Sequence, residues 1–222
     1  MDRIWFLTWS TYGSRLPGDA RGFVSNIRHP DGKGTRINEP GVPPAENMPA
    51  LREYHESRLK GSVIRLGVEH AKDVLPQLHE TAAYRDWVLL VASVMADHIH
   101  LIVGVIGDPE PTDLLRDFKS YASRRLNAKW AKPQSGTWWT EGGSKRKLAE
   151  LEDKINGISY VQRQPSPLVT WSDWTRIESE LGTWAVLCLR ERLCQELQTE
   201  GGELSSGERG ASAPCCTKPR SR

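Results

Sequence analysis

Two apolar segments separated by a short polar turn constrain the fold of this chain more than any other feature. Residues 87–95 form an apolar run of strand length, and residues 98–106 form a second run directly after a turn at Asp97. Two strands joined by so short a connection pair antiparallel, because a parallel pair needs a crossover of a dozen or more residues. The chain is therefore predicted to build an antiparallel sheet around this pair.

Further strands and helices are predicted on both sides of the pair. Aromatic and β-branched residues predict a strand over residues 3–9, and residues 62–68 are a second candidate. Apolar residues at helical spacing predict helices over residues 69–84 and 113–130. Pro49 near the first turn and Gly61 after the end predict a helix over residues 49–60, and roughly residues 145–163 are a further candidate. Strands and helices interspersed in this way predict an α+β fold, with one antiparallel sheet and helices packed on it.

The apolar pattern divides the chain into a domain and a tail. With 222 residues, 38% of them apolar, the chain is long enough for one domain with a substantial core. The pattern weakens near its end, so residues 1–175 are predicted to form the domain and residues 176–222 the tail. The tail is expected to be partly helical over residues 184–197 and disordered over 199–222, which offer no apolar face to bury.

The cysteines and the lack of long apolar runs bear on location. All four cysteines lie beyond residue 187, so no disulfide framework spreads through the predicted domain. No apolar run reaches membrane-spanning length, and the N-terminus lacks the basic-then-apolar layout of a secretory signal. We therefore expect a cytoplasmic protein with no membrane partner.

His98 and His100 are the first candidates for a functional site. Side chains two residues apart on a strand project from the same face, so both imidazoles point one way while Ile99 and Leu101 fill the other face. Two imidazoles on a rigid strand suit one divalent cation, although histidine alone does not identify the metal. The alternative is that one ring is a hydrogen-bonded core residue and the other has no role.

The helix predicted over residues 113–130 carries a tyrosine and a local excess of positive charge. At about 100° per residue, Tyr121 lies on the flank of the apolar stripe, from which a hydroxyl can extend toward the sheet; a boundary tyrosine with a solvated hydroxyl is the alternative. The net charge of the chain is only +2, so a nucleic-acid partner must be sought in local clusters. The candidate phosphate contacts are Arg116, Lys119, Arg124, Arg125 and Lys129, and the candidate base-stacking residues are Trp9 and Tyr12. A solvated helix face explains the charges nearly as well.

Four sequence blocks resemble the HUH nucleases, in particular their single-tyrosine transposases of the insertion-sequence and REP-associated types. Ala96-Asp97-His98-Ile99-His100-Leu101-Ile102-Val103 is similar to the histidine motif of that family. The other blocks are residues 118–127, similar to the tyrosine helix, residues 6–19, and residues 138–144 with Tyr160-Val161. The last two blocks resemble one bacterial subgroup, and the similarity covers about residues 4–170.

The resemblance implies a ferredoxin-like sheet, a Mg²⁺ or Mn²⁺ ion, and single-stranded or hairpin DNA as the substrate. It implies that His98 and His100 bind the metal and that Tyr121 is the nucleophile. The expected intermediate is a 5′-phosphotyrosine that leaves a free 3′-hydroxyl. A bacterial, nucleoid-associated enzyme is expected, and a homodimer is one option because relatives include dimers.

The third metal ligand departs from the family pattern. The family usually has a Gln or Asn about one turn after the tyrosine, where this chain has Arg125. Asn127 is the nearest amide and Asp117 lies on the same flank as Tyr121, so both are candidate ligands. Three explanations stay open: an unusual third ligand, a shifted tyrosine assignment, or a catalytically impaired DNA-binding derivative. A metal-dependent hydrolase that uses water in place of the tyrosine is a further alternative.

Overall fold

A five-stranded antiparallel sheet in the order β6-β1-β5-β4-β7 forms the centre of the molecule. The structure is a computed structural model that describes residues 1–20, 27–28, 34–35, 47–183, 185–187, 189–190 and 193. The strands are β1 (Arg3–Ser10), β4 (Val88–Val94), β5 (His98–Val105), β6 (Ser144–Lys147) and β7 (Val169–Ser172). β4 and β5 come from the two apolar runs and pair antiparallel across their short turn.

Two helices connect the strands in a ferredoxin-like manner. α2 (Val68–Tyr84) lies between β1 and β4 in the chain, and α3 (Pro111–Lys129) lies between β5 and β6. Strands β1, β4, β5 and β6 thus form a β-α-β-β-α-β unit. In the sheet, β5 lies between β1 and β4, which α2 connects, and β1 lies between β5 and β6, which α3 connects. The predicted fold class, α+β with a ferredoxin-like antiparallel sheet, is confirmed.

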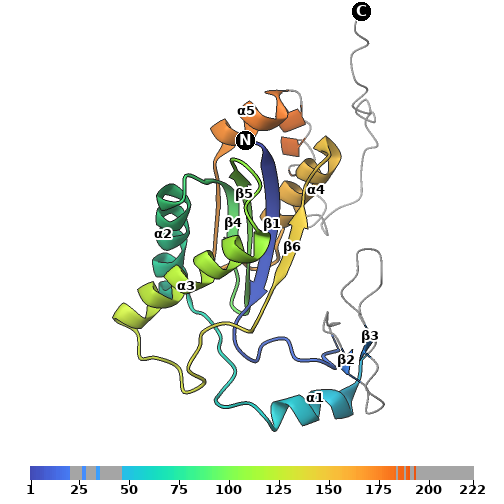
Figure 1. The fold of residues 1–222 in the computed structure, drawn as a ribbon, viewed down its shortest axis with the longest axis vertical. Helices are drawn as coiled ribbons and strands as arrows, with labels where there is room; N and C mark the ends of the chain where they lie inside the picture. The colour runs from blue at the N-terminus through green and yellow to red at the C-terminus, as the bar shows by residue number, and fades with distance from the viewer. Residues whose placement is uncertain are drawn as a thin grey trace, which may run out of the picture.

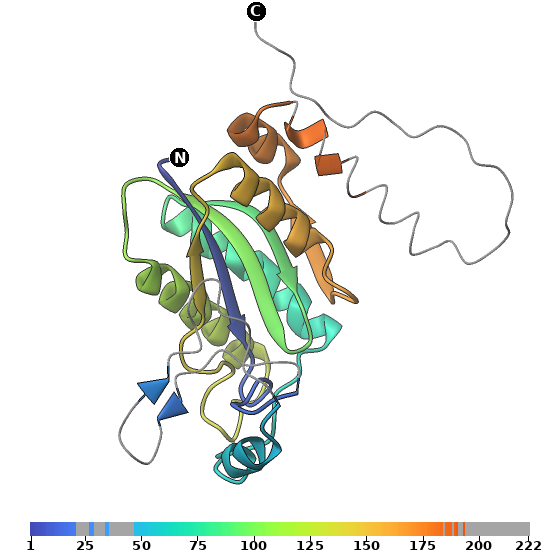
Figure 2. The ribbon, with the colours of Figure 1, turned by 90° about the vertical axis from the view of Figure 1, so that its right-hand side faces the viewer.

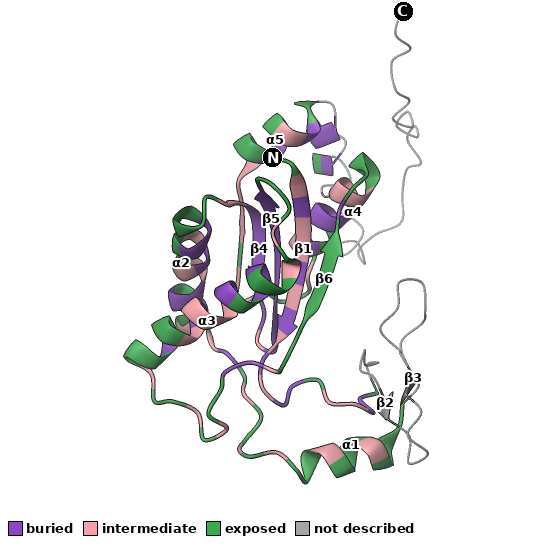
Figure 3. Ribbon diagram, viewed as in Figure 1, coloured by how far each residue is buried: buried purple, intermediate pink, exposed green. Residues whose placement is uncertain are grey.

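The helices form one layer on each face of the sheet (Figures 1 and 2). α2 and α3 cover one face, where Ile99 and Leu101 pack with Phe118 in one buried cluster. α4 (Leu151–Gln162) and α5 (Trp174–Leu181) cover the other face, where Ile102 packs with Ile158. Because successive strand side chains point to opposite faces, β5 contributes to both clusters, and its eight residues are all buried (Figure 3).

Two predicted elements are wrong. Residues 62–67 form no strand: the amide of Ile64 donates to the carbonyl of Tyr12 (2.9 Å) and that of Leu66 to Ala96 (2.7 Å), so this segment bonds to two separate loops. Residues 144–147 form β6 and not the start of a helix, although their four side chains are all exposed. β6 is an edge strand, and its basic side chains discourage pairing with another chain.

The predicted domain boundary at residue 175 falls inside α5. Ile177, Leu181, Ala185, Val186 and Leu189 are buried in the cluster beneath α4. The packed part of the chain therefore continues at least to Leu189. The disorder predicted for residues 199–222 concerns residues outside the described part of the chain.

Three further elements lie apart from the main sheet. α1 (Pro49–Glu56) has no buried residue and ends earlier than the helix predicted over residues 49–60. β2 (Ile27–Arg28) and β3 (Gly34–Thr35) form a separate antiparallel pair. None of the helices in the described part of the chain combines the length and the apolar character needed to cross a membrane.

Candidate active site

His98 and His100 lie side by side on β5, on the sheet face that α4 covers. They alternate along the strand with Ile99 and Leu101, which belong to the cluster on the opposite face. The centroids of the two imidazole rings are 4.5 Å apart, and both side chains are buried. The two rings thus share one face, as the alternation of strand side chains requires.

A neighbouring side chain engages one nitrogen of each imidazole. Nδ1 of His98 is hydrogen bonded to Oδ1 of Asp97, and Nδ1 of His100 to Oγ1 of Thr8 at 2.7 Å. An ionised carboxylate only accepts hydrogen bonds, so Nδ1 of His98 carries a proton, and in the neutral form of the ring Nε2 holds the lone pair. When Thr8 accepts from Nδ1 of His100, that ring also presents an unprotonated Nε2.

The Nε2 atom of His100 is the feature that most favours a metal ion. Among the buried side-chain atoms that the structure describes, it is one of the few with no hydrogen-bond partner, an unfavourable state unless a ligand occupies it. Burial, together with the charges of His98 and Arg15, lowers the pKa of His100 to about 3, so the ring is neutral at neutral pH. A neutral imidazole with a free lone pair is the form that binds a divalent cation. The residues present therefore fit a metal ion.

A tyrosine does stand beside the histidines, and it is Tyr160 of α4. Its ring centroid lies 5.3 Å from that of His100 and 5.8 Å from that of Phe6 on β1. Phe6 also contacts His100, with a centroid distance of 5.5 Å, so the three rings form one cluster. Tyr160 is 48% exposed, which places it where a substrate can reach it from solvent.

A glutamine follows Tyr160 by one helical turn. Nε2 of Gln164 donates to the carbonyl of Tyr160 at 2.9 Å, which keeps this amide close to the tyrosine. Within the described part of the chain, no three His, Cys, Asp or Glu side chains are arranged to hold a metal ion. An amide oxygen, as in Gln164, is a ligand of another type that suits the oxygen preference of Mg²⁺ and Mn²⁺.

Tyr121 does not reach the histidines, and the prediction that it does is wrong. α3 packs on the opposite face of the sheet, where Phe118 lies in the cluster with Ile99 (Figure 2). The ring of Tyr121 contacts Tyr84 of α2, with centroids 6.0 Å apart. The sheet itself separates the Tyr121 hydroxyl from the two imidazoles.

The two predicted third ligands on α3 are wrong for the same reason. Asp117 is buried on the α3 side and forms an ion pair with Arg85 at 2.7 Å. Oδ1 of Asn127 accepts a hydrogen bond from Nε1 of Trp138 at 2.9 Å. Both side chains have structural partners, and neither shares a face with the histidines.

Three of the basic residues predicted to contact DNA form ion pairs within the protein. Arg116 pairs with Asp113 at 2.7 Å. Arg125 and Lys129 both approach Asp73, at 4.0 Å and 3.0 Å. These pairs offset much of the positive charge that the sequence places on α3, and DNA contacts by the three residues stay a prediction.

Lys119 and Arg124 differ from those three. Nζ of Lys119 donates to the carbonyls of Thr140 and Gly142, both at 2.7 Å, and burial lowers its pKa to about 8. Lys119 therefore ties the loop before β6 to α3 and is poorly placed to contact phosphate. The guanidinium of Arg124 lies over the ring of Tyr121, with 5.0 Å to the centroid.

The two predicted stacking residues contact other parts of the protein. Trp9 is 1% exposed and packs edge-on against Trp139 at 6.1 Å, so the prediction that it stacks on a base is wrong. The hydroxyl of Tyr12 accepts a hydrogen bond from the amide of Lys60 at 2.8 Å. Its contact with DNA stays a prediction.

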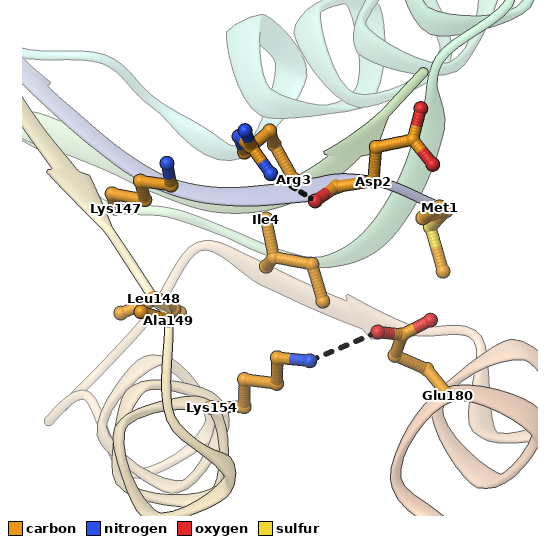
Figure 4. A pocket seen from close by; sticks show the side chains of 9 residues that line it. All are labelled: Met1, Asp2, Arg3, Ile4, Lys147, Leu148, Ala149, Lys154 and Glu180. Carbon is orange, nitrogen blue, oxygen red and sulfur yellow. Dashed lines mark hydrogen bonds and ion pairs between the residues drawn. The ribbon is translucent and has the colours of Figure 1, made fainter. Parts of the chain in front are cut away.

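The histidines do not lie in the pocket at the start of β1, whose volume is about 260 Å³. That pocket contains the ion pair between Lys154 and Glu180, at 3.0 Å (Figure 4). Its lining residues are Met1, Asp2, Arg3, Ile4, Lys147, Leu148, Ala149, Lys154 and Glu180. The pocket therefore has no part in the arrangement of His98, His100 and Tyr160.

Comparison with known proteins identifies the family. Residues 62–162 match the family model described as IS200-like transposases, and this segment includes both histidines and Tyr160. Over this segment the chain is similar to the IS200-like transposases. The predicted family is thereby confirmed, and it indicates a transposase role. No curated protein matches the chain.

Two solved structures resemble this transposase at low identity. One is described as a REP-associated tyrosine transposase bound to a REP hairpin: it is 10% identical over 72% of this chain, with a TM-score of 0.38, and this chain spans 64% of its length. The other is described as a candidate transposase from Deinococcus radiodurans R1: it is 14% identical over 75% of this chain, which covers 94% of its length, with a TM-score of 0.37. Because both TM-scores lie below 0.5, neither likeness carries an argument about function.

Sequence reasoning missed Tyr160 as the tyrosine nearest the histidines, although one signal for it was present. The amide expected one turn after the tyrosine is absent after Tyr121 and present after Tyr160, as Gln164. Of the three explanations left open for the missing amide, a shifted tyrosine assignment agrees with the geometry.

Proposed function

We propose that this transposase cleaves and rejoins single-stranded or hairpin DNA, with Tyr160 as the nucleophile. The observation that carries the proposal is the contact between the rings of Tyr160 and His100, at 5.3 Å on the α4 face. Tyr160 is the partly exposed phenol beside a neutral, unpartnered imidazole nitrogen, within the segment that matches the transposase family.

The proposed cofactor is Mg²⁺ or Mn²⁺, held by Nε2 of His98, Nε2 of His100 and the amide oxygen of Gln164. Such an ion polarises a phosphate oxygen and offsets the negative charge that develops during attack on phosphorus. Thr8 and Asp97 engage the Nδ1 atoms of the two rings, which leaves both Nε2 atoms for the proposed ion.

In the proposed reaction, the oxygen of Tyr160 forms a bond to phosphorus and gives up its proton. The bond between phosphorus and the 3′ oxygen breaks, and that oxygen takes up a proton and leaves as a 3′-hydroxyl. The 5′ end of the DNA stays on Tyr160 as a phosphotyrosine, which conserves the bond for rejoining. Attack by a 3′-hydroxyl on the phosphotyrosine reverses these steps and restores the tyrosine.

Arg15 supplies positive charge near His100. Its charge contributes to lowering the pKa of His100, so the guanidinium lies close enough to act on the site. Hydrogen bonds from Oγ of Ser14 and from the amide of Thr11 to the carbonyl of Asp97 hold this loop against the turn before His98. An exposed arginine at this place attracts the phosphate of an incoming strand.

A covalent adduct between protein and DNA tests the proposal. The full chain is incubated with an end-labelled oligonucleotide and Mn²⁺, and adducts that survive denaturation are resolved on a gel. The Tyr160→Phe variant is expected to form no adduct, because the ring stays and only the attacking oxygen is removed. Tyr121→Phe is the matched control and is expected to form the adduct at the wild-type level.

The same experiment separates the alternatives. An adduct in Tyr160→Phe that disappears in Tyr121→Phe would refute the assignment of the nucleophile. Cleavage without any adduct would indicate a hydrolase that uses water. DNA binding without cleavage would indicate a non-catalytic derivative, although Gln164 after Tyr160 removes the departure that favoured that alternative.

A further inference from the structure

Tyr121, which has no part in the proposed catalytic site, lies beside a second tyrosine, and an arginine lies over each of the two rings. Its ring centroid is 6.0 Å from that of Tyr84, at the last residue of α2. Tyr84 is 70% exposed, so most of its ring is accessible to a ligand and little of it packs against the protein. The two rings therefore form an aromatic surface between the end of α2 and the middle of α3.

An arginine flanks each ring. The guanidinium of Arg85 lies 5.3 Å from the centroid of Tyr84, and that of Arg124 lies 5.0 Å from the centroid of Tyr121. Asp117 holds Arg85 in place with an ion pair of 2.7 Å. Within the described part of the chain, no carboxylate lies within ion-pair distance of Arg124, so its charge is available to a ligand. We call Tyr84, Arg85, Tyr121 and Arg124 the two-tyrosine patch.

We propose that the two-tyrosine patch binds unpaired bases of the DNA, at a site separate from the one where the strand is cut. The inference rests on the proposed function, which supplies DNA as the ligand. The two-tyrosine patch indicates where a second contact with that DNA lies. Nucleic-acid bases stack on aromatic rings and on guanidinium planes, and the arginine charges attract the phosphates between them. An acidic peptide would use the guanidiniums but leave the two ring surfaces without partners.

The position of the patch predicts how its contribution depends on DNA length. α2 and α3 lie on the face of the sheet opposite α4, so the patch and Tyr160 are separated by the sheet and by helix layers (Figures 1 and 2). Each helix layer is roughly 10 Å thick. A strand that occupies both sites must continue around the edge of the molecule, and a short strand at Tyr160 cannot reach the patch.

Binding of two labelled single strands by the full chain tests the proposal. One strand has about 6 nucleotides, near the lower end of the roughly 4–16 nucleotides that a single-strand groove covers, and the other has about 30, beyond the upper end. Tyr84→Leu combined with Tyr121→Leu is expected to weaken binding of the long strand by about 5- to 140-fold for each stacked base that is lost. Binding of the short strand is expected to stay at the wild-type level.

Three controls separate stacking from other effects. Tyr84→Phe combined with Tyr121→Phe keeps both rings and is expected to bind the long strand like the wild type. Tyr54→Leu removes an exposed tyrosine of α1 that lies under Arg58 at 4.5 Å, without a second tyrosine beside it, and is expected to change nothing. Arg124→Gln is expected to make the dependence of log affinity on log salt concentration less steep, by the amount that corresponds to the loss of about one phosphate contact.

Several results would overturn the inference. They are unchanged long-strand binding in the double leucine variant, an equal loss for both strands, or the same loss in Tyr54→Leu. A change of oligomeric state in sedimentation would instead identify the patch as a contact between two copies of the chain. Failure of the proposed function is seen separately, as the lack of an adduct that depends on Tyr160.

Discussion

Replacing Thr8 by valine should weaken metal binding without changing the shape of the site. Valine has nearly the volume of threonine but no hydroxyl, so the bond of 2.7 Å between Oγ1 of Thr8 and Nδ1 of His100 is lost. His100 is 5% exposed, so little water can replace the hydroxyl. The ring then has no partner that keeps the proton on Nδ1 and the lone pair on Nε2.

Two independent estimates give the size of this effect. Leaving a buried donor without a partner costs about 1–3 kcal/mol. Removing a side chain that orients a metal-binding histidine typically lowers metal affinity by about 10- to 100-fold, which corresponds to about 1.4–2.8 kcal/mol. We therefore expect Thr8→Val to bind Mn²⁺ about 10- to 100-fold more weakly than the wild type.

Calorimetric titration of the metal-free protein with Mn²⁺ measures this affinity directly and needs no DNA. Thr8→Ser keeps a hydroxyl on β1 and is the matched control, with an expected loss of less than about fivefold. Thermal unfolding of all three proteins without metal checks that the fold is kept. Wild-type Mn²⁺ affinity in Thr8→Val would refute the claim that this hydroxyl orients His100.

Three further predictions concern the stability of the fold. A chain that ends at residue 175 should not fold stably, because it lacks the buried side chains of Ile177, Leu181 and Leu189. Burial of each contributes roughly 1.5–3 kcal/mol, whereas the free energy of unfolding of a typical domain is only about 5–15 kcal/mol. A cooperative melt like that of the full chain, measured by circular dichroism, would contradict this prediction. Leu101→Ala should lower the free energy of unfolding in urea by about 2–5 kcal/mol, because Leu101 is fully buried on the central strand. For Lys119, whose folded pKa of about 8 lies below the usual 10.5, the unfolded chain binds more protons between these two values. Wild-type stability should then rise relative to Lys119→Met as the pH increases from 8 to 10, and equal pH dependence of the two proteins would exclude this effect.

The parts of the fold that were predictable from sequence have strong local patterns. The apolar runs of β4 and β5 and the short turn between them required an antiparallel pair whatever the rest of the chain did. The apolar stripe of α3, with Leu115, Phe118 and Ala122, likewise identified a helix before its partners were known. β6 had no such pattern, because all four of its side chains are exposed and it is recognised only by its pairing with β1.

The candidate site divides in the same way. That His98 and His100 project together follows from the two-residue period of a strand, which is a property of the backbone. Which tyrosine stands above them does not follow from the helical pattern, because Tyr121 and Tyr160 both lie on amphipathic helices. Only the order of strands in the sheet separates the two helices.

The amino-acid sequence by itself determined the central strand pair, the shared face of the two histidines and the family. The tertiary structure decided which helix lies over that face. Crossovers between parallel strands are right-handed, so the helices that link β1 to β4 and β5 to β6 must lie on the same side of this sheet. α4 follows the last strand of that unit and is not one of these two crossovers. It covers the opposite side of the sheet and carries Tyr160. Because the handedness rule applies only to a known strand order, the helical pattern of each segment did not place the phenol, and the one local signal for it was Gln164, one turn after Tyr160.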